Sequence, residues 1–530
     1  MAELITAAQM RAIEAEAIAS GRVTGLELME RAGRGVVEAI FEEWPELAAT
    51  SRRAVVLCGP GNNGGDGFVV ARLLKEWGWE VEAYLYGDPD KLPPDARVNY
   101  ERWNSPTRSL FDVNDAEIFD FDVVVDALFG TGLVRPVQNL SNLFGTLRMG
   151  MDTASPTILE GPPFIVAVDA PSGLDMDSGK VLGETDAGLE TGLPSSAVAH
   201  LTVAFHSMKH GHILAEGPSR CGKAVVASIG IEGRPPGQLE APIELADVDC
   251  VAGIVKRSGH HKYNHGHAVV LSGAMGRSGA ARLAARAALR VGAGLVTVAA
   301  PGSAMMECAT QLTAIMLRKC KGAEGLATLL EDKRLNALCL GPGLGVGQET
   351  RDLVGAALAD PARGVVLDAD ALTSFADDPN ALFSMLHPKV VLTPHAGEFA
   401  RLFPDIADKL NAPATTGPAY SKVDATRAAA ERAGCVVLFK GPDTVIADPN
   451  GAFAINAAVY DRAAPWLATA GSGDVLAGLI TGLIARGLSP MQASETAAWL
   501  HVEAARAFGP GLIAEDLPEM LPQVFRDLGL

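Results

Sequence analysis

Three glycine-rich loops in the first half of the chain carry acidic side chains. They read GPGNNGGDG (59–67), DALFGTG (126–132) and DAPSG (169–173), and each follows an apolar run. Glycines permit tight turns and a close approach of ligand to backbone. Asparagine, aspartate and serine oxygens suit a hard cation such as K⁺, Na⁺ or Mg²⁺, and an aspartate can also abstract a proton. The loops therefore predict an ion-binding or acid–base site.

The first loop also matches the pattern G-x-G-x-x-G through its glycines at 59, 61 and 64. That pattern, between a strand and a helix, is typical of dinucleotide binding. The loop adds Asn62, Asn63 and Asp66, which a pyrophosphate clamp does not need, because backbone amides suffice and a carboxylate repels phosphate. Its ligand is therefore expected to be recognised by side chains as well.

A structural role for the acidic residues is the alternative. Asp126 and Asp169 could cap helices or turns, since aspartate is a favoured cap. Open parallel sheets, however, bind ligands at the carboxyl ends of their strands. Three acidic loops at such ends favour a site over three separate caps.

A glycine-rich turn in the second half precedes an apolar helix, in LATAGSGDVLAGLITGLIARG (467–487). The amides of Gly471, Ser472 and Gly473 would lie at the N-terminus of that helix, which is a natural anion site. No GK[ST] follows, so this is not a Walker loop. Asp474 is placed to accept a proton from a hydroxyl that attacks a bound phosphate, although simple capping remains open.

Three further motifs of the second half carry polar groups. FKGPDTVIADPNG (439–451) offers Lys440, Gly441 and Thr444 for a nucleotide, and TPHAGE (393–398) offers a histidine and a glutamate. SGHHKYNHGHAVV (258–270) holds four histidines, but their spacing lacks a standard ligand geometry. This last segment favours a polar surface loop.

The elements that position these motifs are short apolar runs separated by helical stretches. They lie at 54–61, 81–88, 121–132, 164–173 and 223–231 in the first half, and at 267–273, 293–301, 336–343, 364–372, 389–398 and 435–447 in the second. Runs that are apolar on both faces predict parallel sheets covered by helices. EGRPPGQLEAP (232–242) interrupts the pattern and is interpreted as a linker. We expect two α/β domains in tandem, 1–235 and 243–530, and an irregular loop at 136–163.

The amino-acid composition excludes some classes of binding partner. The chain carries 44 basic and 63 acidic side chains, a net charge of −19, which argues against nucleic acid or an anionic membrane. No apolar run is long enough to span a bilayer, and the N-terminus lacks a signal-peptide layout. Seven scattered cysteines without a CxxC spacing argue against a disulfide framework or a zinc site. A cytoplasmic protein is predicted.

In this order, the motifs resemble the family of bifunctional NAD(P)H-hydrate repair enzymes. The resemblance covers nearly the whole chain, and its anchors are GPGNNGGDGFVVARLL, VVVDALFGTG, VAVDAPSG, HGHAVVLSGAMGRSGAARLAARAALRVGAGLVTVA, LTPHAGEF, FKGPDTVIA and WLATAGSGDVLAG. It implies an epimerase of the YjeF N-terminal type, a Rossmann-like α/β/α sandwich, fused to an ADP-dependent dehydratase of ribokinase-like fold.

The family's substrate is NAD(P)HX, a hydrated NADH or NADPH with a hydroxyl at C6 of the nicotinamide ring. The resemblance implies that the first half interconverts its R and S forms. The second half would phosphorylate the S hydroxyl from ADP with Mg²⁺, and loss of phosphate would restore NAD(P)H and leave AMP.

The resemblance also implies site residues. In the first half, NAD(P)HX would contact Asn62, Asn63, Gly64, Gly65, Asp66, Gly130, Thr131, Gly132, Leu133, Val134, Arg135, Pro136 and Asp169, with Asp169 catalytic. A potassium ion would be held by Asn63, Asp126 and Ser172. In the second half, NAD(P)HX would contact Ala280, Gly343, His395 and the catalytic Asp474. ADP or AMP would contact Lys440, Gly441, Pro442, Asp443, Thr444 and Gly473.

Two rival readings remain at this level. The second half could be a ribokinase-like kinase of a stable small molecule, which would release a phosphorylated product. The first half could be a non-catalytic ligand-binding module. The role of Lys209, in AFHSMKHGH (204–212), and homo-oligomer formation stay open.

Overall fold

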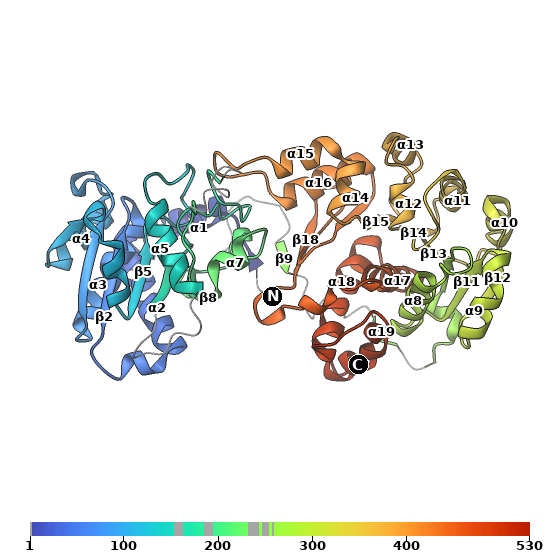
Figure 1. Cartoon of the computed structure of the whole chain (residues 1–530), viewed down its shortest axis with the longest axis horizontal. Helices are drawn as coiled ribbons and strands as arrows, with labels where there is room; N and C mark the ends of the chain where they lie inside the picture. Colours follow the sequence, from blue (N-terminus) through green and yellow to red (C-terminus); the bar gives the residue numbers. More distant parts are fainter. Residues whose placement is uncertain (1–2, 153–162, 185–193, 232–242, 246–253, 257–258) are drawn as a thin grey trace. The chain divides into compact units, whose positions relative to one another are not determined.

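A computed structural model describes residues 3–152, 163–184, 194–231, 243–245, 254–256 and 259–530. The chain divides into two compact units (Figure 1). The N-terminal unit comprises Ala2–Pro242 and Ala412–Ser421, and the C-terminal unit comprises Ile243–Asn411 and Lys422–Leu530. The predicted linker at 232–242 lies outside the described residues. No helix in the described ranges is long and apolar enough to cross a membrane.

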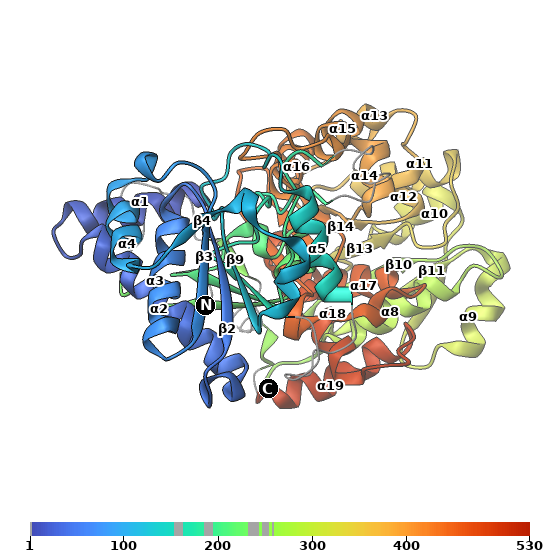
Figure 2. The same cartoon turned by 60° about the vertical axis from the view of Figure 1, so that its left-hand side comes forward.

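Within the described residues, the N-terminal unit is built on a seven-stranded sheet in the order β4-β3-β2-β5-β6-β7-β8. Its strands are β2 (Arg53–Cys58), β3 (Glu80–Leu85), β4 (Thr107–Ser109), β5 (Val123–Ala127), β6 (Phe164–Val168), β7 (Leu201–Phe205) and β8 (Lys223–Ala227). All neighbours run parallel, and Figure 2 shows β2 and β3 side by side. The strand order reverses between β2 and β5, which is where such sheets bind ligands.

Helices cover both faces of this sheet. They are α1 (Ala7–Ala19), α2 (Gly25–Glu43), α3 (Asn62–Glu76), α4 (Pro94–Trp103), α5 (Ser141–Asp152) and α7 (Gly217–Cys221), after a short strand β1 (Glu3–Leu4). One core joins Val36 and Phe68 to the first face, and a second joins Phe144 and Leu147 to the other. The Rossmann-like α/β/α sandwich is thereby confirmed.

The irregular loop predicted at 136–163 is wrong for part of its length, because α5 occupies 141–152. Leu143, Phe144 and Leu147 lie on one face of this helix and are buried in the second core. Such apolar spacing is that of an amphipathic helix. The segment is helical because that face has a sheet to pack against.

The C-terminal unit is built on a second sheet, in the order β9-β18-β17-β16-β15-β14-β13-β10-β11-β12. Its strands are β9 (Ile243–Leu245), β10 (His267–Leu271), β11 (Leu295–Ala300), β12 (Met316–Lys319), β13 (Ala337–Leu340), β14 (Gly364–Leu367), β15 (Val390–Leu392), β16 (Val436–Phe439), β17 (Asp443–Ala447) and β18 (Phe453–Ala457). The strands from β10 to β16 pair in parallel. β16, β17 and β18 pair antiparallel. The expected ribokinase-like α/β architecture is confirmed.

The helices of this unit surround the sheet. They are α8 (Gly279–Arg290), α9 (Met305–Gln311), α10 (Gly322–Leu329), α11 (Gln348–Leu358), α12 (Asp370–Thr373), α13 (Pro379–Phe383), α14 (Ala396–Leu402), α15 (Pro404–Asn411), α16 (Lys422–Ala433), α17 (Ser472–Ala485), α18 (Pro490–Phe508) and α19 (Asp516–Asp527). Helix α17 is buried from Val475 to Ala485. A helix that is apolar all round belongs in a core.

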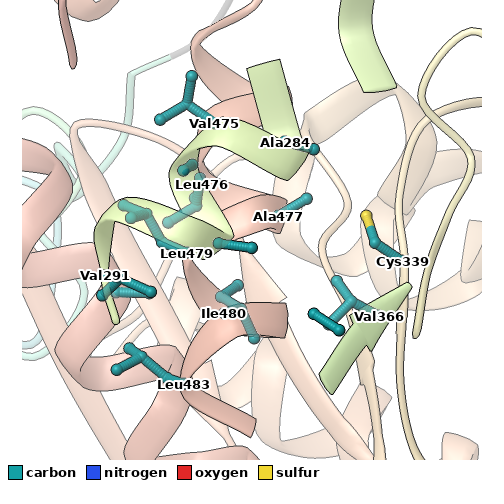
Figure 3. Packing of buried hydrophobic residues seen from close by; sticks show 14 of the residues in the cluster. Ala284, Val291, Cys339, Val366, Val475, Leu476, Ala477, Leu479, Ile480 and Leu483 are labelled. Carbon is teal, nitrogen blue, oxygen red and sulfur yellow. The ribbon is translucent and has the colours of Figure 1, made fainter. Parts of the chain in front are cut away.

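Helix α17 packs tightly against α8 (Figure 3). The figure shows Leu476, Leu479 and Ile480 of α17 in one buried cluster with Ala284 of α8 and the strand residues Cys339 and Val366. A Cβ added at Gly478 would lie 2.1 Å from Ala284 O, so only glycine permits this approach. The packing fixes the N-terminus of α17, which carries Asp474.

Candidate functional sites

A cavity of about 930 Å³ opens at the carboxyl ends of β2, β5 and β6. Its volume is in the range of small-molecule sites. The predicted residues that line it are Asn62, Asn63, Asp66, Gly130, Thr131, Gly132, Leu133, Val134, Arg135, Pro136 and Asp169. The structure thus brings three separate motifs to one cavity.

Two predicted contact residues of the first loop do not line this cavity. An added Cβ at Gly64 would lie 2.0 Å from Gly59 O, and one at Gly65 would lie 2.5 Å from Met29 Sδ. Both glycines are buried within α3, where they allow the helix to pack closely against its surroundings. The N-terminus of α3, which begins at Asn62, carries backbone amides without helical partners.

Asp169 is held at the cavity wall by a buried ion pair. Its Oδ1 accepts a hydrogen bond from Lys209 Nζ at 2.9 Å, and its Oδ2 accepts one from the Thr131 amide at 3.3 Å. The Lys209 side chain is fully buried and also donates to Phe205 O at 2.9 Å. Burial opposes ionisation of Asp169, but the Lys209 ammonium outweighs it and lowers the pKa of this carboxyl. Asp169 is therefore an anion at neutral pH.

The backbone of Asp169 is strained, with φ at +64°. A non-glycine residue in this left-handed region costs roughly 1–2 kcal/mol. His212 Nε2 lies 3.0 Å from Asp169 O and stabilises the turn. Burial, followed by the Lys209 charge, lowers the pKa of His212 to about 4, so the ring is neutral at physiological pH.

Two more carboxyl groups line the same cavity, on Glu14 of α1 and Asp66 of α3. Burial, followed by the charge of Asp169, raises the pKa of Glu14 to about 7. The same causes, in the same order, raise the pKa of Asp66 well above its ordinary value. The cavity therefore holds one carboxylate kept ionised and two carboxyls that retain protons more readily.

The predicted ion site centres on Asp126, which is fully buried at the end of β5. Its Oδ1 accepts from Ser172 Oγ at 2.6 Å and its Oδ2 from the Ser172 amide at 2.8 Å. No basic side chain of the described residues forms an ion pair with Asp126, and burial raises its pKa. A buried carboxylate requires a counter-charge or a proton, and the carboxylate and hydroxyl oxygens gathered here are of the type that binds a hard cation.

Asn63, at the start of α3, forms its side-chain hydrogen bonds with neighbouring segments and not with Asp126. Its amide nitrogen donates to Val168 O at 3.2 Å, and its amide oxygen accepts from the Gly130 amide at 3.3 Å. The structure therefore joins Asp126 directly to Ser172, and connects Asn63 to the same loops.

In the C-terminal unit, a second cluster gathers around Lys440. Its Nζ donates to Asp368 Oδ1 at 2.7 Å and lies 3.8 Å from Glu398 Oε2. Asp474 is the third residue of α17, after Gly471 in the left-handed region at φ +90°. Burial and the charge of Asp368 raise the pKa of Asp474 to about 6, against the opposing effect of Lys440. At neutral pH most of Asp474 is ionised.

The predicted nucleotide loop is a tight hairpin turn between β16 and β17. The Gly441 amide donates to Thr444 Oγ1 at 3.2 Å, and Thr444 Oγ1 donates to Gly441 O at 2.7 Å. Pro442 O accepts from the Ala458 amide at 2.7 Å. Asp443 Oδ1 accepts from Lys422 Nζ at 2.6 Å. A Cβ added at Gly473 would lie 3.6 Å from Lys440 Nζ, so Lys440 and the start of α17 are neighbours.

His395 joins the same cluster through Glu398. The His395 amide donates to Glu398 Oε2 at 2.9 Å, and its Nδ1 accepts from the Gly397 amide at 3.0 Å. Gly343 and Ala280 lie together at the ends of β13 and the start of α8, since a Cβ added at Gly343 would be 3.8 Å from Ala280 Cβ. No hydrogen bond among the described residues joins that pair to Asp474.

A cavity of about 810 Å³ along α8 is lined by Arg282, Arg286 and Arg290, and by none of the predicted dehydratase residues. Of the histidines of 259–267, His260 and His261 are exposed, and His265 and His267 are half-buried, around a short 3-10 helix at Lys262–His265. The six cysteines within the described ranges are buried and form no disulfide with one another.

Reasoning from sequence did not assign Lys209, Glu14 or Asp368. Lys209 lies four residues after the end of β7, and nothing in the local sequence indicates that its side chain pairs with Asp169. Asp368 follows an apolar strand in LDAD, the same arrangement as Asp126 and Asp169. Glu14 stands on an amphipathic helix, where nothing local distinguishes it.

Two family models match this chain. Residues 25–211 match the YjeF-related protein N-terminus, and residues 268–522 match NAD(P)H-hydrate dehydratase. The bifunctional NAD(P)H-hydrate repair enzyme Nnr of Moorella thermoacetica is 36% identical over 99% of this chain and 97% of its own length. The chain belongs to the bifunctional NAD(P)H-hydrate repair enzyme family.

Other members of this family and its two halves are similar as well. The Nnr protein of Coxiella burnetii is 31% identical, over 96% of each chain. The NAD(P)H-hydrate epimerase of Rhodobacter capsulatus is 48% identical over 41% of this chain and 95% of its own. A solved ADP/ATP-dependent NAD(P)H-hydrate dehydratase from Bacillus subtilis, co-crystallised with ATP and Mg²⁺, is 25% identical with a TM-score of 0.45, and covers 55% of this chain and 100% of its own.

Proposed function

We propose that the N-terminal unit epimerises NAD(P)HX and that the C-terminal unit dehydrates the S form, with ADP as phosphate donor. The observation that carries this proposal is a pair of acid–base clusters, each at the carboxyl ends of its own sheet. Asp169 pairs with Lys209 in one. In the other, Lys440 pairs with Asp368 and acts electrostatically on Asp474. The family membership of the chain supports it over both rival readings. A cytoplasmic location stays a prediction.

Epimerisation must break and remake a bond to C6, which carries a hydroxyl and the ring nitrogen. If the hydroxyl leaves as water, the nitrogen lone pair forms a C=N⁺ bond, and water can return on the other face. The cation needs a nearby anion, and the returning water needs a proton acceptor. Asp169, held ionised by Lys209, supplies both.

We place a potassium ion with Asp126, Ser172 and Asn63. The support is the fully buried Asp126 carboxylate, which lacks a basic partner among the described residues. A single carboxylate with neutral oxygens favours a weakly hydrated monovalent ion over Mg²⁺, which keeps several waters. The ion would order the 126–132 and 169–173 loops, and so position Asp169 and Thr131.

Dehydration begins with attack of the C6 hydroxyl oxygen on the terminal phosphate of ADP. Asp474 accepts the hydroxyl proton, and the amides of Gly471, Ser472 and Gly473 hold the phosphate oxygens. Phosphate then leaves C6 as a proton leaves C5, which restores NAD(P)H and leaves AMP. Mg²⁺, bound with ADP, would neutralise phosphate charge. Lys440 and Thr444 would hold the nucleotide, and His395, Gly343 and Ala280 the dinucleotide.

The full chain incubated with an R,S mixture of NADPHX, ADP, Mg²⁺ and K⁺ tests this function. We expect both epimers to disappear on chromatography, with equal amounts of NADPH, AMP and free phosphate. A stable phosphorylated product instead of free phosphate would identify a kinase. If the S epimer is consumed and the R epimer disappears no faster than it does without the enzyme, the first half is non-catalytic.

A further inference from the structure

Helix α1 brings a carboxyl group to the epimerase cavity from outside the matched family region. Glu14 and Arg11 of α1 line the cavity, whereas the match to the family model begins at residue 25. The helix is firmly positioned: Thr6 and Gln9 form a capping box, and the Ala7 amide donates to Asp177 Oδ1 at 2.7 Å. Met10, Ile13 and Ala17 are buried.

The Glu14 carboxyl has no structural partner. It makes no hydrogen bond and no ion pair with another described residue, although its side chain is only partly exposed. A carboxyl that served the fold would be expected to pair with Arg11, one helical turn earlier. Its environment is instead the cavity, where Asp169 and Lys209 act on it electrostatically.

The charged groups around Glu14 come from four elements. Arg11 stands on α1, Asp66 on α3, Asp169 after β6 and Lys209 after β7. Asp169 and Lys209 form an ion pair with each other, and the Asp169 carboxylate acts on Glu14 more strongly than the Lys209 ammonium does. Burial, followed by Asp169, raises the pKa of Glu14 to about 7, so both of its protonation states are populated at neutral pH.

We propose that Glu14 is a catalytic acid of epimerisation, which protonates the C6 hydroxyl as it leaves the nicotinamide ring. This inference rests on the proposed function of the N-terminal unit. The C6–O bond breaks, its electron pair goes to oxygen, and the Glu14 proton completes the departing water. The ring nitrogen lone pair forms C=N⁺. A water then adds to the opposite face and gives its proton to Asp169.

The cycle closes without an added reactant. Asp169 returns its proton readily to solvent because its pKa is lowered, and Glu14 regains one. The reverse epimerisation uses the same two groups in exchanged roles. An acid and a base in one site, with pKa values pushed apart by their surroundings, is the arrangement that such a reaction needs.

The test is the pH profile of epimerisation by the full chain and its variants Glu14→Gln and Glu14→Asp. Glu16→Gln is the matched control, because Glu16 is exposed on the same helix and does not line the cavity. For Glu14→Gln we expect kcat to fall about a hundredfold, the usual effect of losing a general acid, with KM changed less than about twofold. Dehydration and Glu16→Gln should match wild type.

The wild-type kcat should fall as pH rises above about 7, where Glu14 loses its proton. This limb should vanish in Glu14→Gln and persist at a shifted pH, with partial activity, in Glu14→Asp. A Glu14→Gln enzyme with near wild-type kcat, or with the same limb, would overturn the inference while leaving the proposed function intact. No epimerisation by wild type would instead overturn the proposed function. If Glu14→Gln fails to fold, the profile of Glu14→Asp decides, because an unshifted limb at reduced kcat excludes Glu14 as its source.

Discussion

The ammonium group of Lys209 lies 2.9 Å from Asp169 Oδ1 in full burial, beneath the cavity of the N-terminal unit. Removing one partner of a buried ion pair leaves an uncompensated charge, which typically costs about 3–5 kcal/mol. We expect Lys209→Met to lose that much unfolding free energy in urea, and to abolish epimerisation.

The control is Lys223→Met, which removes an exposed ion pair with Glu43 on the same unit. Exposed pairs contribute about 0–1 kcal/mol. Equal unfolding midpoints for both variants would show that the Lys209–Asp169 pair contributes no more than a surface contact.

We expect the rate of epimerisation to depend on potassium through the Asp126 carboxylate. Epimerisation in KCl should exceed that in tetramethylammonium chloride of equal ionic strength, because the larger ion cannot enter a site built on buried oxygens. Asp126→Asn retains hydrogen-bonding capacity but loses the charge, so it should no longer respond to K⁺. Identical wild-type rates in the two salts would contradict the ion site.

Asp474→Asn should separate the two activities. The variant keeps the side-chain size and loses proton acceptance, so dehydration should fall by roughly two to four orders of magnitude. Epimerisation should stay within about twofold, as expected for independent sites. Because Asp474 must be ionised, wild-type dehydration should rise with pH through about 6. Release of phosphate at near wild-type rate by the variant would remove Asp474 from the mechanism.

Stability gives an independent check on Asp474. Its folded pKa is raised, so the stability it contributes is complete below the unfolded value of 3.8 and is lost as pH rises through about 6. Asp474→Asn should therefore melt at or above the wild-type temperature at pH 8. A lower melting temperature at that pH would mean that the carboxylate serves the fold, for instance as a cap of α17.

The contact of α17 with α8 predicts a sharp difference between two helical glycines. Gly478→Ala would place a methyl group 2.1 Å from Ala284 O, and such overpacking costs about 1–3 kcal/mol. Gly355→Ala on α11 meets nothing closer than Met385 Sδ at 3.8 Å, so it should be neutral or stabilising by roughly 0.5–1 kcal/mol. Calorimetry of both variants measures the difference.

Short-range patterns predicted the strands well. The apolar run at 54–61 covers β2 except for Arg53, and the run at 121–132 contains β5, because a buried parallel strand is apolar on both faces regardless of what packs on it. Helix α5 was missed because it contains two glycines, Gly145 and Gly150, which are poor helix formers, and its apolar face is stabilised by the sheet beneath it.

The site was predictable where its residues belong to glycine-rich loops and not elsewhere. Asp126 and Asp169 lie at the ends of β5 and β6, and Asp474 lies in the first turn of α17. Glycine-rich sequence marks each of these positions. Glu14 and Lys209 are separated by nearly two hundred residues and meet only through packing of α1 and β7 around the same cavity. Gly64 and Gly65 belong to the loop motif, yet they allow α3 to pack closely against its surroundings. This role could not be predicted from sequence, because it depends on which residues pack against α3.

The positive φ of Asp169 also has a consequence for the divergence of relatives. Glycine is the residue that this backbone would accept with least strain. Glycine in place of Asp169 would relieve roughly 1–2 kcal/mol of strain but would leave the Lys209 ammonium buried without its partner, at a cost of about 3–5 kcal/mol. A duplicated copy that no longer needs proton chemistry would therefore be expected to change both residues, and glycine at 169 beside an uncharged side chain at 209 would mark a descendant that keeps the scaffold without the catalysis.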